Sequence, residues 1–404
     1  MAAEISSAVL ADYQYYKRAF AGRAMPFAYL DLDALGANLR TTVARAGAKR
    51  IRIASKSVRC RGVLARVLQA NPQFQGIMCY TAAEAVWLSG HGFDDLLVGY
   101  PTRDTAQIRA VCAALRADKT IVLMVDAAAY IADLAALAAS EGVTLPLCLD
   151  IDLALDVPGL HFGVWRSAVR SVADALAVYA TIARYPQLRL DGVMGYEAQV
   201  AGVGDTTPGQ GAKNALIRVL KRRSVALAAR RRAAIVGTLR DRGAALRLVN
   251  GGGTGSLEST TREACITEVT VGSGIFAPTL FDAYAAFRYQ PAAGFAIPIV
   301  RQPRPDIYTC LGGGYVASGS AGPEKLPQPF LPAGARLLPL EGAGEVQTPV
   351  IYTGPELLQP GDPIFMRHAK AGELCEHFNT LLLVAGGAVV GELPTYRGEG
   401  MAFL

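Results

Sequence analysis

One lysine, Lys56, lies where a side-chain amine could do covalent chemistry. Alternating apolar residues lead up to it from Lys49 to Ile53, a pattern that predicts a buried parallel strand. At the carboxyl end of such a strand we expect Lys56 to be buried, and burial favours the uncharged amine that forms Schiff bases. The alternative is a solvated lysine at the start of a loop.

A run of glycines forms the second candidate. Residues 251–253 are all glycine, and Thr254, Gly255 and Ser256 follow them. Glycines let backbone amides approach an anion closely, and the two hydroxyl groups add donors. The run matches neither a dinucleotide fingerprint nor a P-loop, so a purely structural turn is the alternative. Taken with Lys56, it suits an aldehyde cofactor that carries a phosphate, and we predict pyridoxal 5'-phosphate (PLP).

Eight short β-rich runs alternate with Ala- and Leu-rich helical stretches over about 250 residues. The runs are 27–31, 50–54, 76–80, 95–99, 121–125, 145–150, 190–195 and 246–250. Eight βα units predict an α/β fold of the (β/α)8 TIM-barrel type, in which functional groups stand at the carboxyl ends of the strands. An open, doubly wound sheet is the alternative. Asp31 and Asp150 end two of these runs. They are interpreted either as site residues or as structural carboxylates.

The sequence changes character near Gln290. From there prolines and glycines are frequent and helical periodicity is almost absent. We therefore predict a C-terminal all-β domain over residues 289–404, after a PLP-binding barrel over residues 26–288. Residues 1–25 have no βα partner and are expected to pack with the β-domain or on a second subunit.

The composition is that of a globular chain with a substantial core. Of 404 residues, 51% are hydrophobic and 18% are charged, and seven cysteines occur without a CxxC pair, which favours reduced thiols in a cytoplasmic protein. No secretory signal or membrane-length apolar run is seen. Two basic clusters, 221–223 and 230–232, predict the solvated face of an outer helix, with no nucleic-acid or membrane partner.

Seven motifs follow one another in an order that carries a family resemblance. They are PFAYLD (26–31), ASK (54–56), DID (150–152), FGV (162–164), GYE (195–197), GGGTG (251–255) and TEV (267–269). Their order resembles the fold type III PLP-dependent enzymes of the alanine racemase class, and most of all the D-threonine aldolase and D-serine dehydratase group, including the amino acid deaminase/aldolase type.

This resemblance implies a barrel with a C-terminal β-domain and a homodimer with active sites near the subunit interface. It also implies that Lys56 carries the cofactor as a Schiff base and that Tyr196 lies close to it. The remaining cofactor-binding residues that we expect are His161, Asn250, Gly252, Gly253 and Thr254.

The sequence departs from that group around the lysine. The aldolases and dehydratases carry a Pro-His pair before it and a Thr-His pair after it, where this chain has Ile53-Ala54 and Ser57-Val58. The histidine that resembles their base for the substrate hydroxyl is therefore missing. His161 stands where relatives usually carry an arginine that supports the phenolic oxygen of the cofactor.

The metal site of the group is also altered. Its C-terminal His-x-Asp or His-x-Cys pair corresponds to His368-Ala369-Lys370, so only His368 is left as a metal ligand. The Lys370 ammonium could replace the positive charge of the metal beside a substrate hydroxyl. Two alternatives remain open, a zinc site and a hydrogen-bonded polar cluster. The first combines His368 with Cys375, Glu376 and His377, and the second combines His368, Lys370, Glu373 and Glu376.

The predicted activity is that of a PLP-dependent lyase that cleaves β-hydroxy-D-amino acids by a retro-aldol reaction. Lys56 would return the proton to the α carbon, and Tyr196, His368 and Lys370 complete the expected catalytic set. The alternatives are dehydratase or deaminase chemistry on D-amino acids, racemisation, and a PLP-binding protein without catalysis.

Overall fold

The computed structural model describes residues 12–320 and 322–404, which form two compact units. The first unit comprises residues 37–275, 281–289 and 400–404. The second comprises the described residues up to 36, then 276–280 and 290–399. Each unit is described by itself, and the domain boundaries expected from the sequence stay a prediction.

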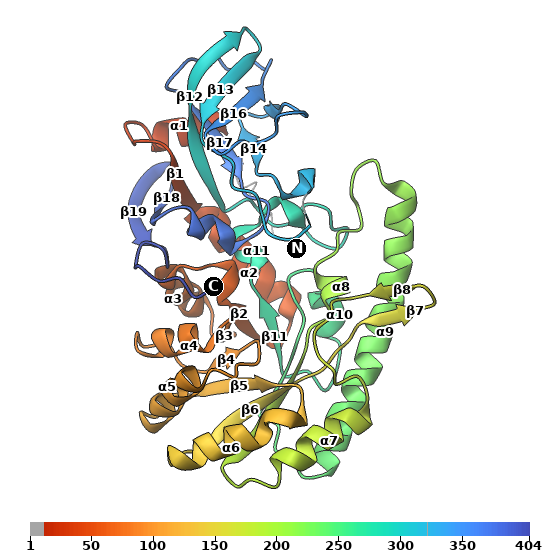
Figure 1. Cartoon of the computed structure of the whole chain (residues 1–404). Coiled ribbons are helices and arrows are strands. Elements are labelled where there is room, and N and C mark those ends of the chain that lie inside the picture. Colours follow the sequence, from red (N-terminus) through yellow and green to blue (C-terminus); the bar gives the residue numbers. More distant parts are fainter. Residues whose placement is uncertain (1–11, 321) are drawn as a thin grey trace, which may run out of the picture. The chain divides into compact units, whose positions relative to one another are not determined.

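A closed barrel of eight parallel strands forms the core of the first unit (Figure 1). Around the barrel the strands are β10 (Leu248–Gly251), β11 (Glu268–Val271), β2 (Arg50–Ala54), β3 (Phe74–Cys79), β4 (Leu96–Val98), β5 (Ile121–Val125), β6 (Leu145–Asp150) and β9 (Leu188–Gly195). Strands β5 and β6 are buried at every position, as expected for parallel strands covered on both faces. The predicted TIM-type fold is confirmed, and the open-sheet alternative is wrong.

Helices follow most of these strands, and α2 (Leu32–Ala46) precedes β2. The others are α3 (Arg61–Ala70), α4 (Ala82–Ser89), α5 (Thr105–Arg116), α6 (Ile131–Ser140), α7 (Val172–Ile182), α8 (Ala198–Ala201), α9 (Gly211–Asp241), α10 (Leu257–Thr260) and α11 (Ser273–Phe276). Side-chain caps start several of them, such as Asp104 at α5 and the Ser171–Asp174 capping box at α7. Of the helices described, none combines the length and apolar content needed to cross a membrane.

The first predicted barrel strand belongs elsewhere. Strand β1 (Phe27–Asp31) pairs with β12 (Ala293–Arg304) and β18 (Thr380–Ala385) in the sheet of the second unit, and β11 takes its place in the barrel. The misassignment has a physical cause. A fully buried apolar strand followed by a helix has the same pattern in either setting, because periodicity does not specify which sheet a strand joins.

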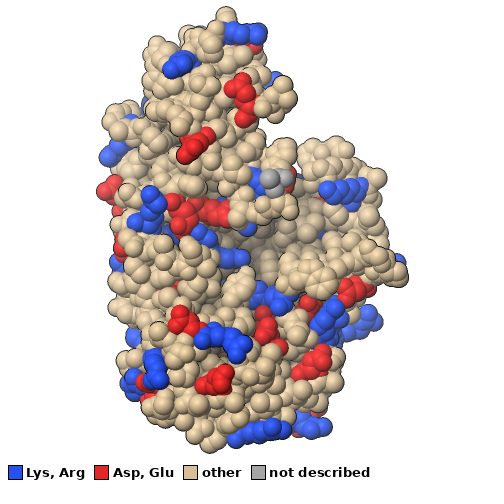
Figure 2. All heavy atoms as spheres, viewed as in Figure 1, with Lys and Arg blue, Asp and Glu red and all other residues tan. Residues whose placement is uncertain are grey.

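Helix α9 confirms the expectation of a solvated basic face only in part, since Arg222, Arg223 and Arg230 are exposed and the other three are not. Lys221 is buried and pairs with Asp205 at 3.0 Å, and Arg232 is fully buried. Arg231 donates from Nη1 to the carbonyl oxygen of Asp152 at 2.8 Å. These side chains tie the helix to strand-end loops. On the face in Figure 2, basic and acidic side chains are interspersed without a patch of one sign.

A buried charge network crosses the barrel wall from β2. Arg52 donates from Nε and Nη2 to the two carboxylate oxygens of Glu268, at 2.7 and 2.9 Å, and from Nη2 to Asp95 Oδ2 at 3.0 Å. Asn250 donates to Glu268 Oε1 at 2.8 Å and exchanges hydrogen bonds with Thr270. Arg52 is thus paired and hydrogen-bonded, as a buried charge must be.

Replacing Arg52 with methionine is expected to destabilise the protein by about 3–5 kcal/mol, because the Glu268 carboxylate is left buried without its cation. Urea unfolding followed by circular dichroism measures the effect. The matched control is Arg103→Met, since the ion pair of Arg103 with Asp133 is exposed and weak. Equal losses in the two variants would contradict the assigned role of the network.

The second unit is built on a nine-stranded sheet. Its main path runs β15 (Arg336–Leu337), β16 (Gln347–Ile351), β13 (Ile307–Leu311), β12, β1, β18 and β19 (Ala388–Pro394), while β14 (Gln328–Leu331) pairs with β17 (Pro363–Arg367), which pairs with β12. Helix α1 (Tyr13–Ala19) packs on this sheet through aromatic rings. The ring of Tyr16 lies 5.5 Å from that of Phe365, and its hydroxyl donates to Asp31 at 2.8 Å.

Candidate active site

Lys56 stands at the carboxyl end of β2, in a short 3-10 helix, η1 (Ser55–Ser57). The Ser55 hydroxyl donates to the carbonyl of Met78 on β3 at 3.0 Å, and the Ser55 carbonyl accepts from the amides of Val58 and Arg59. These bonds fix the turn. The Lys56 side chain is exposed, so the expectation of a buried lysine is wrong. The turn carries the side chain past the end of the strand, where barrel walls no longer enclose it.

The residue that ends this turn has an unusual backbone. Arg59 lies in the left-handed region with φ of 47°, which is unfavourable for a residue other than glycine. Its Nε donates to the Lys56 carbonyl at 3.1 Å, and its guanidinium carbon lies 5.3 Å from the centre of the Tyr80 ring. Arg59 therefore connects the lysine turn to the loop after β3.

The glycine loop after β10 approaches other backbone and side chains closely. Gly252 has φ of 80°. A Cβ atom on Gly253 would lie 2.8 Å from the Cβ of Ala201 and 3.1 Å from a ring carbon of Tyr196, and one on Gly255 would clash with the Ala201 carbonyl. Glycine is therefore required for this path.

A buried polar network holds the loop in place. Ser256 Oγ accepts from the amide of Gly253 at 3.0 Å and donates to Glu197 Oε1 at 3.0 Å, and the Thr260 hydroxyl donates to the same oxygen. Arg232 donates from Nη2 to Glu197 Oε2 at 2.8 Å. Glu197 and Arg232 are functional candidates that the sequence analysis missed. The only signals were the position of Glu197 beside Tyr196 and the basic run on α9.

The loop also has donors to spare. Thr254 Oγ1 accepts from the amide of Gly274 at 3.0 Å, and the Thr254 carbonyl accepts from Arg45 at 2.8 Å. Within residues 12–320 and 322–404, the amides of Thr254 and Gly255 have no acceptor. Unpaired amides in a loop whose path excludes side chains are suited to an anion such as phosphate.

The amine and the anion loop stand at the same mouth of the barrel. In the closed order only β11 separates β10, which leads into the loop, from β2, which leads to Lys56. Two steps between parallel strands span roughly 10 Å. The residues therefore fit a cofactor that carries an aldehyde and a phosphate on one aromatic ring.

Tyr196 and Asn250 lie in different surroundings. Tyr196 follows β9 and packs against apolar residues of the barrel interior beside Gly253. Burial, with the neighbouring Glu197 carboxylate, raises the pKa of Tyr196 to about 12, so its phenol is uncharged at neutral pH. The Asn250 amide is hydrogen-bonded to Glu268 and Thr270 inside the barrel, and a contact between Asn250 and a cofactor stays a prediction.

A carboxylate and a guanidinium meet at the end of β6. Arg166 donates from Nε to Asp150 Oδ2 at 2.7 Å and from Nη2 to the Gly99 carbonyl at 2.5 Å. Asp150 is almost fully buried. Burial raises the pKa of Asp150 to about 7 in spite of the Arg166 guanidinium. Arg166 was not singled out from the sequence, because only the folded loop brings it to the strand end.

His161 lies on a two-stranded hairpin formed by β7 (Leu155–Val157) and β8 (Leu160–Phe162). Its Nδ1 is 2.6 Å from Asp156 Oδ1, and its ring stacks on Trp165 with centroids 3.8 Å apart. Both partners belong to the hairpin and the loop that follows it. A contact between His161 and the cofactor stays a prediction.

His368 and Lys370 lie in the second unit, and their place beside Lys56 stays a prediction. Burial, with the adjacent Arg367, lowers the pKa of His368 to about 3, so its imidazole is uncharged. Neither ring nitrogen of His368 has a partner among the described residues. Lys370 donates to Ser318 Oγ at 2.7 Å and lies 3.9 Å from Glu373, so the predicted polar cluster is found only in part.

By themselves, the residues around His368 do not complete a divalent metal site. An ammonium group cannot serve as the second ligand beside His368, and the part of the chain that the structure describes contains no group of three His, Cys, Asp or Glu side chains placed to hold a metal ion. Cys375, a ligand of the alternative zinc site, lies in a 3-10 helix (Gly372–Glu376), and the ring of His377 stacks on Tyr315 with centroids 4.4 Å apart. His368 as a metal ligand stays a prediction.

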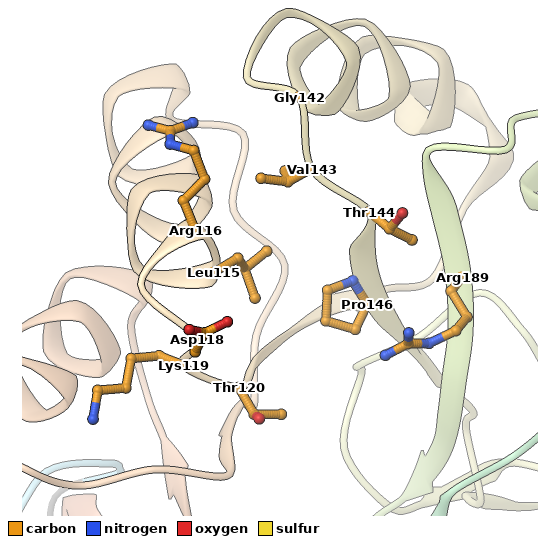
Figure 3. Close-up of a pocket in the computed structure, with 10 residues that line it drawn as sticks. All are labelled: Leu115, Arg116, Asp118, Lys119, Thr120, Gly142, Val143, Thr144, Pro146 and Arg189. Atoms are coloured by element: carbon orange, nitrogen blue, oxygen red, sulfur yellow. The ribbon is translucent and has the colours of Figure 1, made fainter.

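A cavity of about 360 Å³ opens at the opposite end of the barrel strands (Figure 3). Thr120 and Thr144, which line it, immediately precede β5 and β6, so the cavity lies at the amino ends of the strands. Arg116 and Arg189 add charge to its wall, and each is already paired with a carboxylate. This cavity is separate from the mouth that carries Lys56.

Comparisons with known proteins agree with this geometry. Residues 30–278 match the family model described as "Alanine racemase, N-terminal domain". Two 3-hydroxy-D-aspartate aldolases, from Paracoccus denitrificans and from its strain Pd 1222, are 28% and 27% identical over 252 residues, which are 62% of this chain and 60% of each relative. The chain thus spans about three fifths of the length of these curated relatives.

Solved structures share the fold at lower identity. D-threonine aldolase from Filomicrobium marinum superposes with a TM-score of 0.76 and 21% identity, covering 93% of this chain and 95% of that one. D-threo-3-hydroxyaspartate dehydratase from Delftia sp. HT23 superposes with a TM-score of 0.73 and 20% identity, covering 92% of this chain and 97% of that one. At this identity the likeness shows the fold.

Proposed function

Because the chain belongs to the family that shares the alanine racemase N-terminal domain, we propose that it is a PLP-dependent lyase that cleaves β-hydroxy-D-amino acids by a retro-aldol reaction. Its distant relatives are D-amino acid aldolases and dehydratases. The observation that carries the proposal is the placement of Lys56 and the glycine loop at one mouth of a closed barrel, after strands that have only β11 between them.

The side chains around this mouth have distinct tasks. The Lys56 amine would hold the aldehyde carbon of the cofactor, and the loop of residues 252–255 would hold its phosphate beside Tyr196. When bound, PLP supplies an electron sink for the α carbon of an amino acid. Lys56 then has a proton to return to that carbon. Glu197 and Arg232 keep the phosphate loop in position, and Tyr196 remains a neutral phenol.

One other chemistry is supported by a particular observation. Loss of water from the same substrates, as in a dehydratase or deaminase, is supported by the structural likeness to D-threo-3-hydroxyaspartate dehydratase. Racemisation would need a second base on the opposite face of the substrate, and a PLP-binding protein without catalysis would need only Lys56 and the loop. A cytoplasmic homodimer remains part of the proposal.

Incubation of the PLP-loaded protein with D-threonine, D-phenylserine, D-serine and D-alanine tests these possibilities. Assays for aldehyde, oxo acid and the opposite enantiomer are run on each mixture. Aldehyde and glycine from the first two substrates are expected. Oxo acid alone would indicate the dehydratase, inversion of D-alanine the racemase, and no product from any of them the binding protein.

A further inference from the structure

Retro-aldol cleavage needs a group that removes the proton of the substrate hydroxyl, and histidine is the usual choice for such a proton transfer. The chain has four histidines. His368 and His377 lie in the second unit. In the described part of the barrel unit, His91 binds the Trp87 carbonyl at 2.8 Å, and His161 is held by Asp156 and Trp165. Among the described side chains of the barrel unit, an acceptor other than histidine is therefore sought for this part.

Asp150 stands across the barrel from Lys56. In the closed strand order, β6 is four strands away from β2 in either direction, and both residues follow or end their strands at the carboxyl side. A substrate that takes the place of Lys56 on the cofactor aldehyde would lie at the mouth that both residues share. Asp150 is therefore a candidate to meet its β-hydroxyl group.

The two oxygens of Asp150 differ in their partners. Oδ2 accepts from Arg166 Nε at 2.7 Å, and the backbone carbonyl of Asp150 accepts from the Ser167 hydroxyl at 2.7 Å. Oδ1 is buried and has no hydrogen-bond partner among the described residues. A buried, unpaired carboxylate oxygen is costly unless a ligand or a proton satisfies it. Arg166 thus leaves one oxygen available and holds the other.

The surroundings of this carboxyl group bring its pKa close to neutral pH. The ionisable groups facing it are Arg166 and Tyr100 on neighbouring loops, Cys148 and Asp152 on its own segment, and Asp126 and Tyr130 after β5. Burial raises the pKa of Asp150 to about 7, the Asp126 and Asp152 charges act in the same direction, and Arg166 opposes them. A general base works best when its pKa lies near the working pH.

We propose that Oδ1 of Asp150 accepts the proton of the substrate β-hydroxyl group, an inference that rests on the proposed function. The O–H bonding pair becomes the second bond of the aldehyde C=O as the Cα–Cβ bond breaks. The electron pair of the Cα–Cβ bond stays with the α carbon, which takes a proton from Lys56 and leaves as glycine. Asp150 then passes its proton to solvent.

Tyr100 lies beside the Asp150–Arg166 pair. Its ring is 48% exposed and lies 4.7 Å from the guanidinium carbon of Arg166. Arg166 also donates to the Gly99 carbonyl, so the pair is anchored to the loop after β4.

The test compares Asp150→Asn with the exposed control Asp133→Asn in the PLP-loaded protein. For Asp150→Asn we expect kcat to fall by about 10²–10⁴-fold, with KM for D-phenylserine little changed. Activity of the wild type should rise with pH through about 7, because the base must be ionised, and this limb should vanish in the variant. Arg166→Gln keeps the carboxyl group and should move the limb to higher pH.

An infrared readout is independent of activity. In the unloaded wild type, a protonated carboxyl band should disappear as the pH rises through about 7, and Asp150→Asn should lack it. The free energy of unfolding should also depend on pH through Asp150. The raised pKa makes the wild type lose stability as pH rises from 3.8 to about 7, relative to Asp150→Asn.

The outcomes separate this inference from the function on which it rests. Aldehyde production by the wild type, with kcat of Asp150→Asn within about threefold of it or with an unchanged pH limb, overturns the role of Asp150. A loss confined to His161→Gln transfers that role to His161. No aldehyde from any β-hydroxy-D-amino acid contradicts the proposed function itself, and the Asp150 step falls with it. Should Asp150→Asn fail to fold, Arg166→Gln decides by the direction of its shift.

Discussion

Replacing Lys56 with alanine should lower kcat for D-phenylserine by about three orders of magnitude or more. The substitution removes both the amine that binds the cofactor aldehyde and the group that returns the proton to the α carbon. Lys56 is exposed in a turn fixed by Ser55, so its loss leaves no buried cavity. Aldehyde release in a coupled spectrophotometric assay measures the effect, and thermal unfolding should show an unchanged midpoint.

The control for this prediction is Lys119→Ala, at the opposite end of the barrel. It removes the same side chain and should keep wild-type kcat. Added methylamine should restore part of the activity of Lys56→Ala, because a free amine can replace the missing proton donor. Wild-type turnover by Lys56→Ala would remove the basis of the proposed mechanism.

Replacing Gly253 with alanine should weaken PLP binding by about 10–100-fold. The added Cβ would lie 2.8 Å from Ala201 and 3.1 Å from the Tyr196 ring, so the loop must shift. Overpacking of this kind costs about 1–3 kcal/mol. When the loop shifts to relieve it, the anion site is distorted, and the affinity for PLP falls by a corresponding amount. Fluorescence titration with PLP gives the dissociation constant.

Gly237→Ala is the matched control for the glycine loop. Gly237 lies within α9, where an added Cβ meets no atom within 4 Å. Alanine favours a helix over glycine by up to about 1 kcal/mol, so this variant should bind PLP as the wild type does and unfold at a slightly higher temperature. Equal PLP affinity in Gly253→Ala and Gly237→Ala would mean that the loop does not hold the cofactor.

The architecture was largely predictable because its signals are local. Buried apolar runs that alternate with helical stretches predicted the barrel. The frequent prolines and glycines after Gln290 predicted the C-terminal β-region. Strand β1 was misplaced because its pattern is that of a barrel strand, and the pairing that puts it beside β12 and β18 involves residues more than 250 positions away. The residues of strand β11 were noticed only as part of the TEV motif at 267–269.

The site was predictable only where one residue type carries the chemistry. Lys56 and the glycine run could be found because an amine and a side-chain-free loop have few substitutes. Arg232 was read as a surface charge, since only tertiary structure shows that a helix face with arginines packs on Glu197. The Asp150–Arg166 pair depends on a loop conformation that no periodicity predicts.

The most direct test of the central claim is reduction of the PLP-loaded protein with borohydride, followed by peptide mapping. We predict one pyridoxyl adduct, located on Lys56, with loss of the yellow colour, and no adduct in Lys56→Ala. A colourless protein that is unchanged by added PLP, or an adduct confined to another lysine, would contradict the account.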